Sequence, residues 1–345
     1  MSKKRINLAL QGGGAHGAFT WGVLDRILEE SDLEVAAISG TSAGALNGAA
    51  MKAALATGDA ASARDNLNWL WGKIGAVSDP EVADWLRAFS PPVGQIASAI
   101  ETSLPYQMMD MASRMTSPYT LGPFYQNPLT SILDDMHFGN IGAVEGPDLY
   151  VCATNVQTGK IRVFKDDEIT KDAIMASACL PTMFQAVEIY DPVKDKVQSY
   201  WDGGYMGNPP LFPLFEPELP QDIVIVNINP LERQEVPRTP QQIQNRINEI
   251  SFNSSLLREL RSIDFVKRLL RDGSIKPGTM KEIHVHMIAD DTLMNSLNVS
   301  TKIVPSPLVL AELKEAGRIA ADGFLSAHWD DIGTCSSCDL RAMFD

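Results

Sequence analysis

The N-terminal part of the chain alternates apolar runs with glycine-rich turns. Two apolar runs, at residues 6–10 and 35–38, have the length and composition of buried strands. Each leads through a glycine-rich turn into a segment with apolar residues at helical spacing, about 15–30 and 42–57. Two successive strand–turn–helix units are typical of a parallel sheet covered by helices. The pattern therefore predicts an α/β fold with a mostly parallel central sheet.

The residue composition changes between about residues 60 and 146. This segment is rich in Trp and Met and interrupted by prolines. We interpret this segment as a helical cap inserted into one domain that spans residues 1–345. Adaptable Met and aromatic side chains suit an acyl-chain pocket, and the same composition also fits the core of a helical subdomain. The candidate pocket residues are Met108, Met109, Met111 and Phe124.

Regular periodicity returns after the cap, and a C-terminal helical extension is expected over about residues 240–345. The late part of the sheet is predicted from short apolar runs, and the extension from long amphipathic stretches. The expected strands are 149–154 with 163–164, 187–190 with 197–201, 223–228 and 283–288; the expected helices are 169–177, 241–271 (one helix or a pair) and 308–328.

Charge and cysteine content exclude several classes of function. The chain has 345 residues and a net charge of −14, so a nucleic-acid partner is not expected. Four cysteines in a chain of this length do not form a disulfide framework, which favours a reducing compartment. No apolar stretch resembles a secretory signal or a membrane span. We expect a cytoplasmic protein whose membrane contact, where it occurs, is peripheral.

The first glycine-rich turn, Gly12–Gly17, reads Gly-Gly-Gly-Ala-His-Gly. It matches the G-x-G-x-x-G fingerprint of dinucleotide-binding folds, which also needs an acidic residue at the end of the second strand. That strand ends instead in Ile38-Ser39-Gly40. Consecutive glycines before a helix leave backbone N–H groups uncovered, and such groups suit a developing oxyanion. The oxyanion interpretation is therefore favoured over the dinucleotide one.

The second turn, Gly40–Gly44, reads Gly-Thr-Ser-Ala-Gly. Serine between glycines at a strand-to-helix turn is the nucleophile-elbow pattern G-x-S-x-G. A serine at this place is also a good helix N-cap, so the pattern alone is compatible with a structural role. A catalytic Ser42 requires a base within reach, because an unaided hydroxyl is a weak nucleophile.

Candidate bases are five histidines and one aspartate motif. Asp202 ends a predicted strand and precedes Gly203-Gly204, so its carboxylate can approach another loop closely. His328, near Asp330 and Asp331, is where a Ser–His–Asp hydrolase would carry its base. We interpret the other histidines as structural: His16 within the glycine loop, His137 in the cap, and His284 and His286 on one side of a strand without a third metal ligand.

No metal or cofactor is expected. Cys335 and Cys338 have the spacing of a zinc or redox pair, but they lack a second pair, a nearby histidine and a βαβ context.

Taken in order, the glycine loop, the serine elbow, the Ala176–Pro181 block (Ala-Ser-Ala-Cys-Leu-Pro) and Asp202-Gly203-Gly204 resemble the patatin-like phospholipase family. The resemblance covers roughly residues 5–230. It implies a three-layer α/β/α fold, a Ser–Asp dyad without histidine, and hydrolysis of lipid acyl esters. By the same resemblance Ser42 attacks the carbonyl and Asp202 takes its proton. The oxyanion hole is expected from Gly12, Gly13, Gly14 and Ala43.

One position departs from the family pattern. The family usually has Arg or Lys where His16 stands, so a positive charge in the loop, or a contact of this residue with substrate, depends on protonation of His16. Ester hydrolysis is therefore a firmer expectation than phospholipid specificity. Two alternatives stay open: a conventional Ser–His–Asp esterase that uses His328, and a non-catalytic module that binds nucleotide or lipid.

Overall fold

The computed structural model describes residues 3–136, 138–233, 236–276 and 278–344. Its sheet strands are β1 (Lys4–Leu10), β2 (Leu33–Thr41), β3 (Asp148–Asn155), β4 (Ile161–Lys165), β5 (Val187–Asp191), β6 (Lys196–Asp202), β7 (Asp222–Asn227) and β8 (His284–Ala289). Its α-helices are α1 (Gly17–Ile27), α2 (Ala43–Leu55), α3 (Ala60–Ile74), α4 (Pro80–Phe89), α5 (Val93–Thr102), α6 (Leu104–Met115), α7 (Leu129–Asp134), α8 (Phe138–Ile141), α9 (Lys171–Ser177), α10 (Pro240–Arg271), α11 (Asp291–Ser296), α12 (Val299–Ile303) and α13 (Pro307–His328).

The strands form one sheet in the order β5-β6-β3-β2-β1-β7-β8, and β4 pairs with β3 outside this path. All pairings from β3 through β2, β1 and β7 to β8 are parallel. The hairpin β5–β6 and the pairings of β3 with β4 and β6 are antiparallel. The predicted mostly parallel α/β sheet is confirmed.

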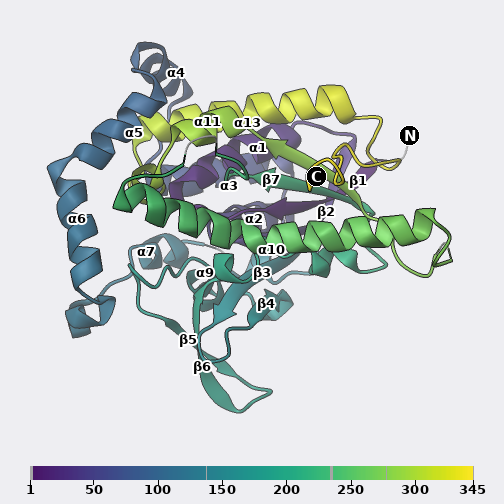
Figure 1. Cartoon of the computed structure of the whole chain (residues 1–345), viewed down its shortest axis with the longest axis horizontal. Coiled ribbons are helices and arrows are strands. Elements are labelled where there is room, and N and C mark those ends of the chain that lie inside the picture. Colours follow the sequence, from purple (N-terminus) through teal and green to yellow (C-terminus); the bar gives the residue numbers. More distant parts are fainter. Residues whose placement is uncertain (1–2, 137, 234–235, 277, 345) are drawn as a thin grey trace.

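Helices cover both faces of the sheet (Figure 1). Alternate residues of β1 illustrate the division: Leu8 and Leu10 belong to the core beneath α1, α2 and α13, whereas Ala9 belongs to a second core beneath α10. The side chains of both cores are buried, as expected of a sheet enclosed on two sides. The expected α/β/α layering is therefore present.

Helices α1 and α13 pack closely because each places a glycine at the contact. A Cβ on Gly22 would lie 1.8 Å from the Lys314 carbonyl oxygen, and a Cβ on Gly317 would lie 2.1 Å from that of Phe19. Any larger residue would push the two helices apart. This contact fixes the C-terminal helix on the N-terminal unit that carries the glycine loop.

The segment between α2 and β3, where the sequence predicts a cap, contains helices α3 to α8. The C-terminal part adds more than helices, because β8 extends the sheet next to β7. The predicted stretch 241–271 is a single helix, α10, whose N-terminus is capped by Thr239 and Gln242 in a capping box.

Candidate active site

Ser42 lies at a strained turn between β2 and α2. Its backbone has φ 54° and ψ −119°, a conformation that non-glycine residues rarely adopt. The turn is tight on both sides: a Cβ on Gly44 would lie 2.1 Å from the Leu10 carbonyl oxygen, and one on Gly40 would lie 2.7 Å from that of Gly44. The glycines are therefore required by close backbone approach, and Ser42 has the geometry of a nucleophile elbow.

Asp202 ends β6 and is 1% exposed. Its Oδ1 accepts a hydrogen bond from the Gly204 amide over 2.8 Å. Within the described residues, the buried Oδ2 accepts no hydrogen bond of ordinary geometry. Burial raises the pKa of this carboxyl to about 7, while the Gly204 amide and the nearby Ser42 hydroxyl favour the ionised form and oppose the rise. Asp202 thus offers one unused acceptor beside Ser42 and changes its charge near neutral pH.

The segment at the C-terminal end of α9 joins the serine turn to the aspartate. The Ser42 amide donates to Ser177 Oγ over 2.8 Å, and the Asp202 amide donates to the Cys179 carbonyl over 2.7 Å. Residues 177–179 lie within the Ala-Ser…Pro block noted in the sequence. Their contacts explain that block physically, because it fixes the spacing between the two candidate catalytic residues.

The glycine loop lies directly against the serine turn. A Cβ on Gly12 would lie 2.7 Å from Ser42 Cβ, so only glycine permits this contact. Gly14 has φ +59°, and a Cβ there would lie 2.3 Å from the Lys302 carbonyl oxygen. The loop ends in the short helical turn η1 (Gly14–His16), which continues into α1.

The expected role of Gly12 as an oxyanion donor is wrong. Its amide donates to Asn208 Oδ1 over 2.6 Å and is therefore already engaged. No hydrogen bond within the described part of the chain uses the amides of Gly13, Gly14 or Ala43. Ala43 also begins α2, where uncompensated N–H groups attract negative charge. These three amides stay candidate oxyanion donors.

Polar side chains from distant segments hold the loop from behind. Asn229 donates through Nδ2 to the Gly12 carbonyl over 2.8 Å, and Lys302 Nζ donates to Asn229 Oδ1 over 2.9 Å. Gln11 Oε1 accepts from the amides of Ile228 and Asn229. The loop is therefore tied to the segment after β7 and to α12.

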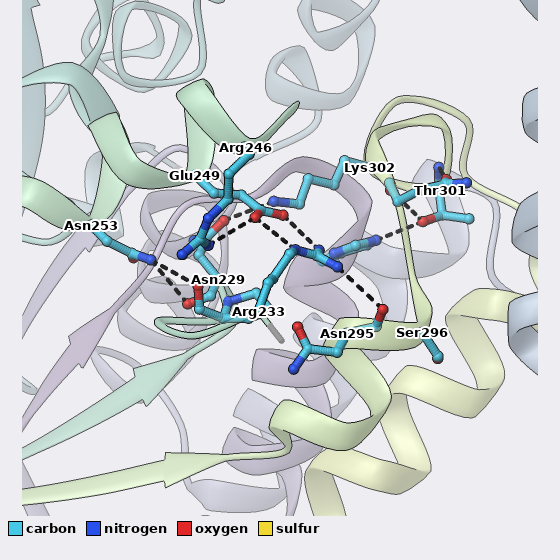
Figure 2. A network of polar contacts seen from close by, with 12 residues as sticks. Asn229, Arg233, Arg246, Glu249, Asn253, Asn295, Ser296, Thr301 and Lys302 are labelled. Atoms are coloured by element: carbon cyan, nitrogen blue, oxygen red, sulfur yellow. Dashed lines mark hydrogen bonds and ion pairs between the residues drawn. The ribbon is translucent and has the colours of Figure 1, made fainter. Parts of the chain in front are cut away.

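Figure 2 shows how this support continues into a charged network on α10. Arg233 makes a two-point ion pair with Glu249, with N–O distances of 2.7 and 2.8 Å, and Arg246 also contacts Glu249. Burial lowers the pKa of Lys302 to about 8; Glu249 opposes this fall and Arg233 adds to it. A partly buried ammonium thus lies behind the glycine loop.

A family model for patatin-like phospholipases matches residues 8–215, which is more than half of the chain. The chain belongs to the patatin-like phospholipase family. The matched range includes the glycine loop, Ser42 and Asp202. Asn229 and Lys302 lie outside it.

The other comparisons add no functional detail. A search of curated proteins found no match. Among solved structures, VipD from Legionella pneumophila matches with a TM-score of 0.42 and 13% identity, over 94% of this chain and 67% of VipD. The type III effector ExoU matches with a TM-score of 0.31 and 16% identity, over 94% of this chain and 53% of ExoU. No residue role is transferred at these values.

His16, the residue that departs from the patatin-like pattern, is buried and uncharged. Its Nε2 lies 2.8 Å from Thr301 Oγ1. The Thr301 hydroxyl donates its single proton to the Asn298 carbonyl, so it must accept from His16, whose Nε2 therefore carries the ring proton. Burial lowers the pKa of His16 well below its ordinary value, and the nearby charges of Lys302 and Arg233 add to this. His16 therefore ties the loop to α12 and supplies no charge, whereas the Lys302 ammonium reaches the loop through Asn229.

His328 lies at the wrong edge of the sheet to serve Ser42. It pairs with Asp331 over 2.8 Å, next to a segment whose Ile332 carbonyl accepts from Lys4 at the start of β1. Ser42 follows the opposite, carboxyl end of the parallel neighbour β2. The length of β2 separates the two by on the order of 25 Å. The structure therefore gives no support to the Ser–His–Asp alternative.

The Met side chains expected to line an acyl pocket face solvent instead. Met108, Met109 and Met111 on α6 are all exposed. Composition misled here, because it reports apolar character and not which face of a helix is covered. The side chain of Phe124 lies outside the described residues.

The remaining sequence candidates have structural contacts. His286 bonds Asp222 and Ser337 through its two ring nitrogens, each over 3.0 Å, and His284 Nδ1 lies 3.4 Å from the same aspartate. Cys335 contacts Asp331, and Cys338 is a free thiol. His137 is outside the described residues. Within the described chain, no group of three potential ligands could hold a metal ion, and no helix is both long and apolar enough to cross a bilayer.

Proposed function

We propose that this patatin-like protein hydrolyses carboxylic ester bonds of lipids through Ser42 and Asp202 and a covalent acyl-enzyme. The observation that carries the proposal is the pairing of a strained serine with a buried carboxylate that has one unused acceptor. Family membership supports the lipid substrate class.

The first half of the reaction transfers the acyl group to the enzyme. The Ser42 hydroxyl gives its proton to Asp202 Oδ2 as its Oγ bonds to the ester carbonyl carbon. Negative charge then develops on the carbonyl oxygen, where the amides of Gly13, Gly14 and Ala43 are suited to stabilise it. As the bond to the alcohol oxygen breaks, Asp202 returns the proton to that oxygen and leaves an ester on Ser42.

The second half releases the fatty acid. Water gives a proton to Asp202 while its oxygen attacks the acyl carbon, and the proton then returns to Ser42 Oγ as the acyl bond breaks. Each proton taken up by Asp202 is thus given back, and the scheme needs no cofactor. The neutral pKa range of Asp202 suits this alternation of acid and base.

A fluorophosphonate probe tests the proposal, because it reacts covalently with activated serines. We expect stoichiometric labelling at Ser42 and turnover of short p-nitrophenyl esters, with both lost in Ser42→Ala. A purified, folded wild-type protein that is not labelled and releases no acid would instead favour the non-catalytic binding module.

A further inference from the structure

Helix α6 exposes an apolar stripe along its whole length. Leu104, Met108, Met111 and Met115 are 69%, 64%, 61% and 73% exposed. Their spacing of four, three and four residues places them on one face of the helix. A soluble helix normally turns such a face toward the core. We call these four residues the α6 stripe.

Helix α4, which precedes α5 and α6 in the chain, also exposes apolar side chains along one face. Val82, Trp85 and Phe89 are exposed at spacings of three and four residues, and the two rings contact each other with centroids 5.4 Å apart. Helices α4, α5 and α6 run along one side of the molecule, away from the sheet (Figure 1). We call residues 80–115 the arm. A large exposed apolar surface of this kind marks an interaction site.

Helix α5, in the middle of the arm, contacts the segment that supports the glycine loop. The carbonyl of Ala97 on α5 accepts from Asn298 Nδ2 over 3.3 Å, and Asn298 also bonds Glu101 over 2.9 Å. Asn298 caps α12, the helix that carries Thr301 and Lys302. Helix α5 is thus attached to the same short helix that supports the glycine loop.

The C-terminal end of the arm leads to the segment that holds Asp202. After α6 the chain forms the turn η2 (Pro118–Phe124), where Tyr119 Oη accepts from the Ala186 amide over 3.0 Å. Gln185 Nε2 donates to the Pro118 carbonyl over 3.2 Å, and the Gln185 carbonyl accepts from Cys179 Sγ. The chain is therefore connected to α12 just before α6 and to the segment that holds Asp202 just after it.

The charges of the arm favour a neutral lipid surface over an anionic one. Residues 79–119 contain five acidic and two basic side chains, a net charge of −3. Both basic groups are already paired: Arg87 with Asp84, Glu312 and Glu315, and Arg114 with Asp110. Binding to anionic headgroups would need basic residues on the polar face of the helix.

We propose that the α6 stripe inserts into the surface of zwitterionic phospholipid and so places the site at the lipid–water interface. This inference rests on the proposed lipid-hydrolase function. Unbranched Met side chains adapt to an irregular apolar surface, such as the acyl-chain region of a bilayer. The apolar face together with acidic surroundings selects a bilayer without net charge.

The test is vesicle binding by the full chain carrying Ser42→Ala, so that hydrolysis does not alter the lipid. Cosedimentation with phosphatidylcholine vesicles, and separately with phosphatidylglycerol vesicles, is compared for this protein, for a triple variant (Met108→Gln, Met111→Gln, Met115→Gln) and for Ile319→Gln. Ile319 is 63% exposed on α13, outside the arm, and serves as the matched control. Thermal melting establishes that each variant is folded.

We expect the triple variant to lose at least tenfold in vesicle partitioning and Ile319→Gln to bind normally. The proposal is overturned by equal binding of the triple variant, by equal loss in the control, or by preference for phosphatidylglycerol vesicles. It is also overturned if light scattering shows a dimer that the triple variant dissociates, because a second copy would then cover the stripe. Turnover of a soluble ester by the wild type tests the catalytic proposal separately.

Discussion

The side chain of Asn208 forms hydrogen bonds with both the amide and the carbonyl of Gly12. The Gly12 amide donates to Asn208 Oδ1 over 2.6 Å, and Asn208 Nδ2 donates to the Gly12 carbonyl over 3.3 Å. This two-point contact holds the glycine loop as a neighbouring strand would, although the residues are 196 positions apart. It fixes the position of Gly12 against Ser42 and leaves the amides of Gly13 and Gly14 unused.

Replacing Asn208 should therefore impair catalysis more than stability. Asn208→Ala removes both contacts and leaves the Gly12 amide unpaired, so we expect kcat on a p-nitrophenyl ester to fall at least about tenfold, as when an oxyanion donor is displaced. The matched control is Asn66→Ala, which removes a single bond to the Ala50 carbonyl on α2. Equal kcat in the two variants would show that the Gly12 contact does not position the loop.

The pH dependence should report the ionisation of Asp202. Its pKa is raised to about 7 by burial, and only the ionised form accepts the serine proton. We expect kcat/KM to rise about tenfold per pH unit below 7 and to level off between pH 7 and 8. A profile that is flat between pH 5 and 8 would contradict a role for this carboxylate as the base.

Burial of the ionised Asp202 carboxylate lowers the free energy of unfolding at high pH. A folded-state pKa above the unfolded value favours the protonated form, so the penalty is absent below about pH 4 and fully present above about pH 7. Asp202→Asn should therefore raise the free energy of unfolding at pH 8, by up to about 4 kcal/mol, and change it little at pH 4. Urea denaturation at the two pH values measures the free energy of unfolding. A larger gain at pH 4 than at pH 8 would contradict the prediction.

Lys302 should set an alkaline limit to activity. Its ammonium bonds Asn229, which holds the Gly12 carbonyl, and burial lowers its pKa to about 8. We expect kcat to fall above pH 8 in the wild type, to stay level in Lys302→Arg, and to be low throughout in Lys302→Met. Lys281→Met is the control, because that ammonium bonds carbonyls of the segment 214–216. An unchanged alkaline limit in Lys302→Arg would exclude Lys302 as its source.

The sequence identifies those parts of the site that depend on local backbone geometry. Ser42 and Gly14 have unusual dihedral angles, and at Gly12 and Gly44 another part of the chain approaches closely. The glycine-rich sequence itself therefore predicts the turns. The sheet is predictable for the same reason, since buried parallel strands are continuous apolar runs.

The support of the loop is not predictable in this way. Asn208, Asn229 and Lys302 are ordinary polar residues whose partners lie about 200 or more positions away, or on a different element. A weak signal exists for Asn229, which follows β7 at the carboxyl edge where the other site residues gather. The exposure of the α6 stripe could not be predicted either, because an apolar helical face has the same sequence pattern whether it is buried or exposed.

The most direct test of the Ser–Asp account is kcat/KM of Asp202→Asn on p-nitrophenyl butyrate at pH 8. Asparagine preserves the size of the side chain and an acceptor for the Gly204 amide but cannot take the proton of Ser42. The account predicts a fall of at least about a thousandfold, since the serine loses its activating base. Activity within about tenfold of the wild type would contradict it.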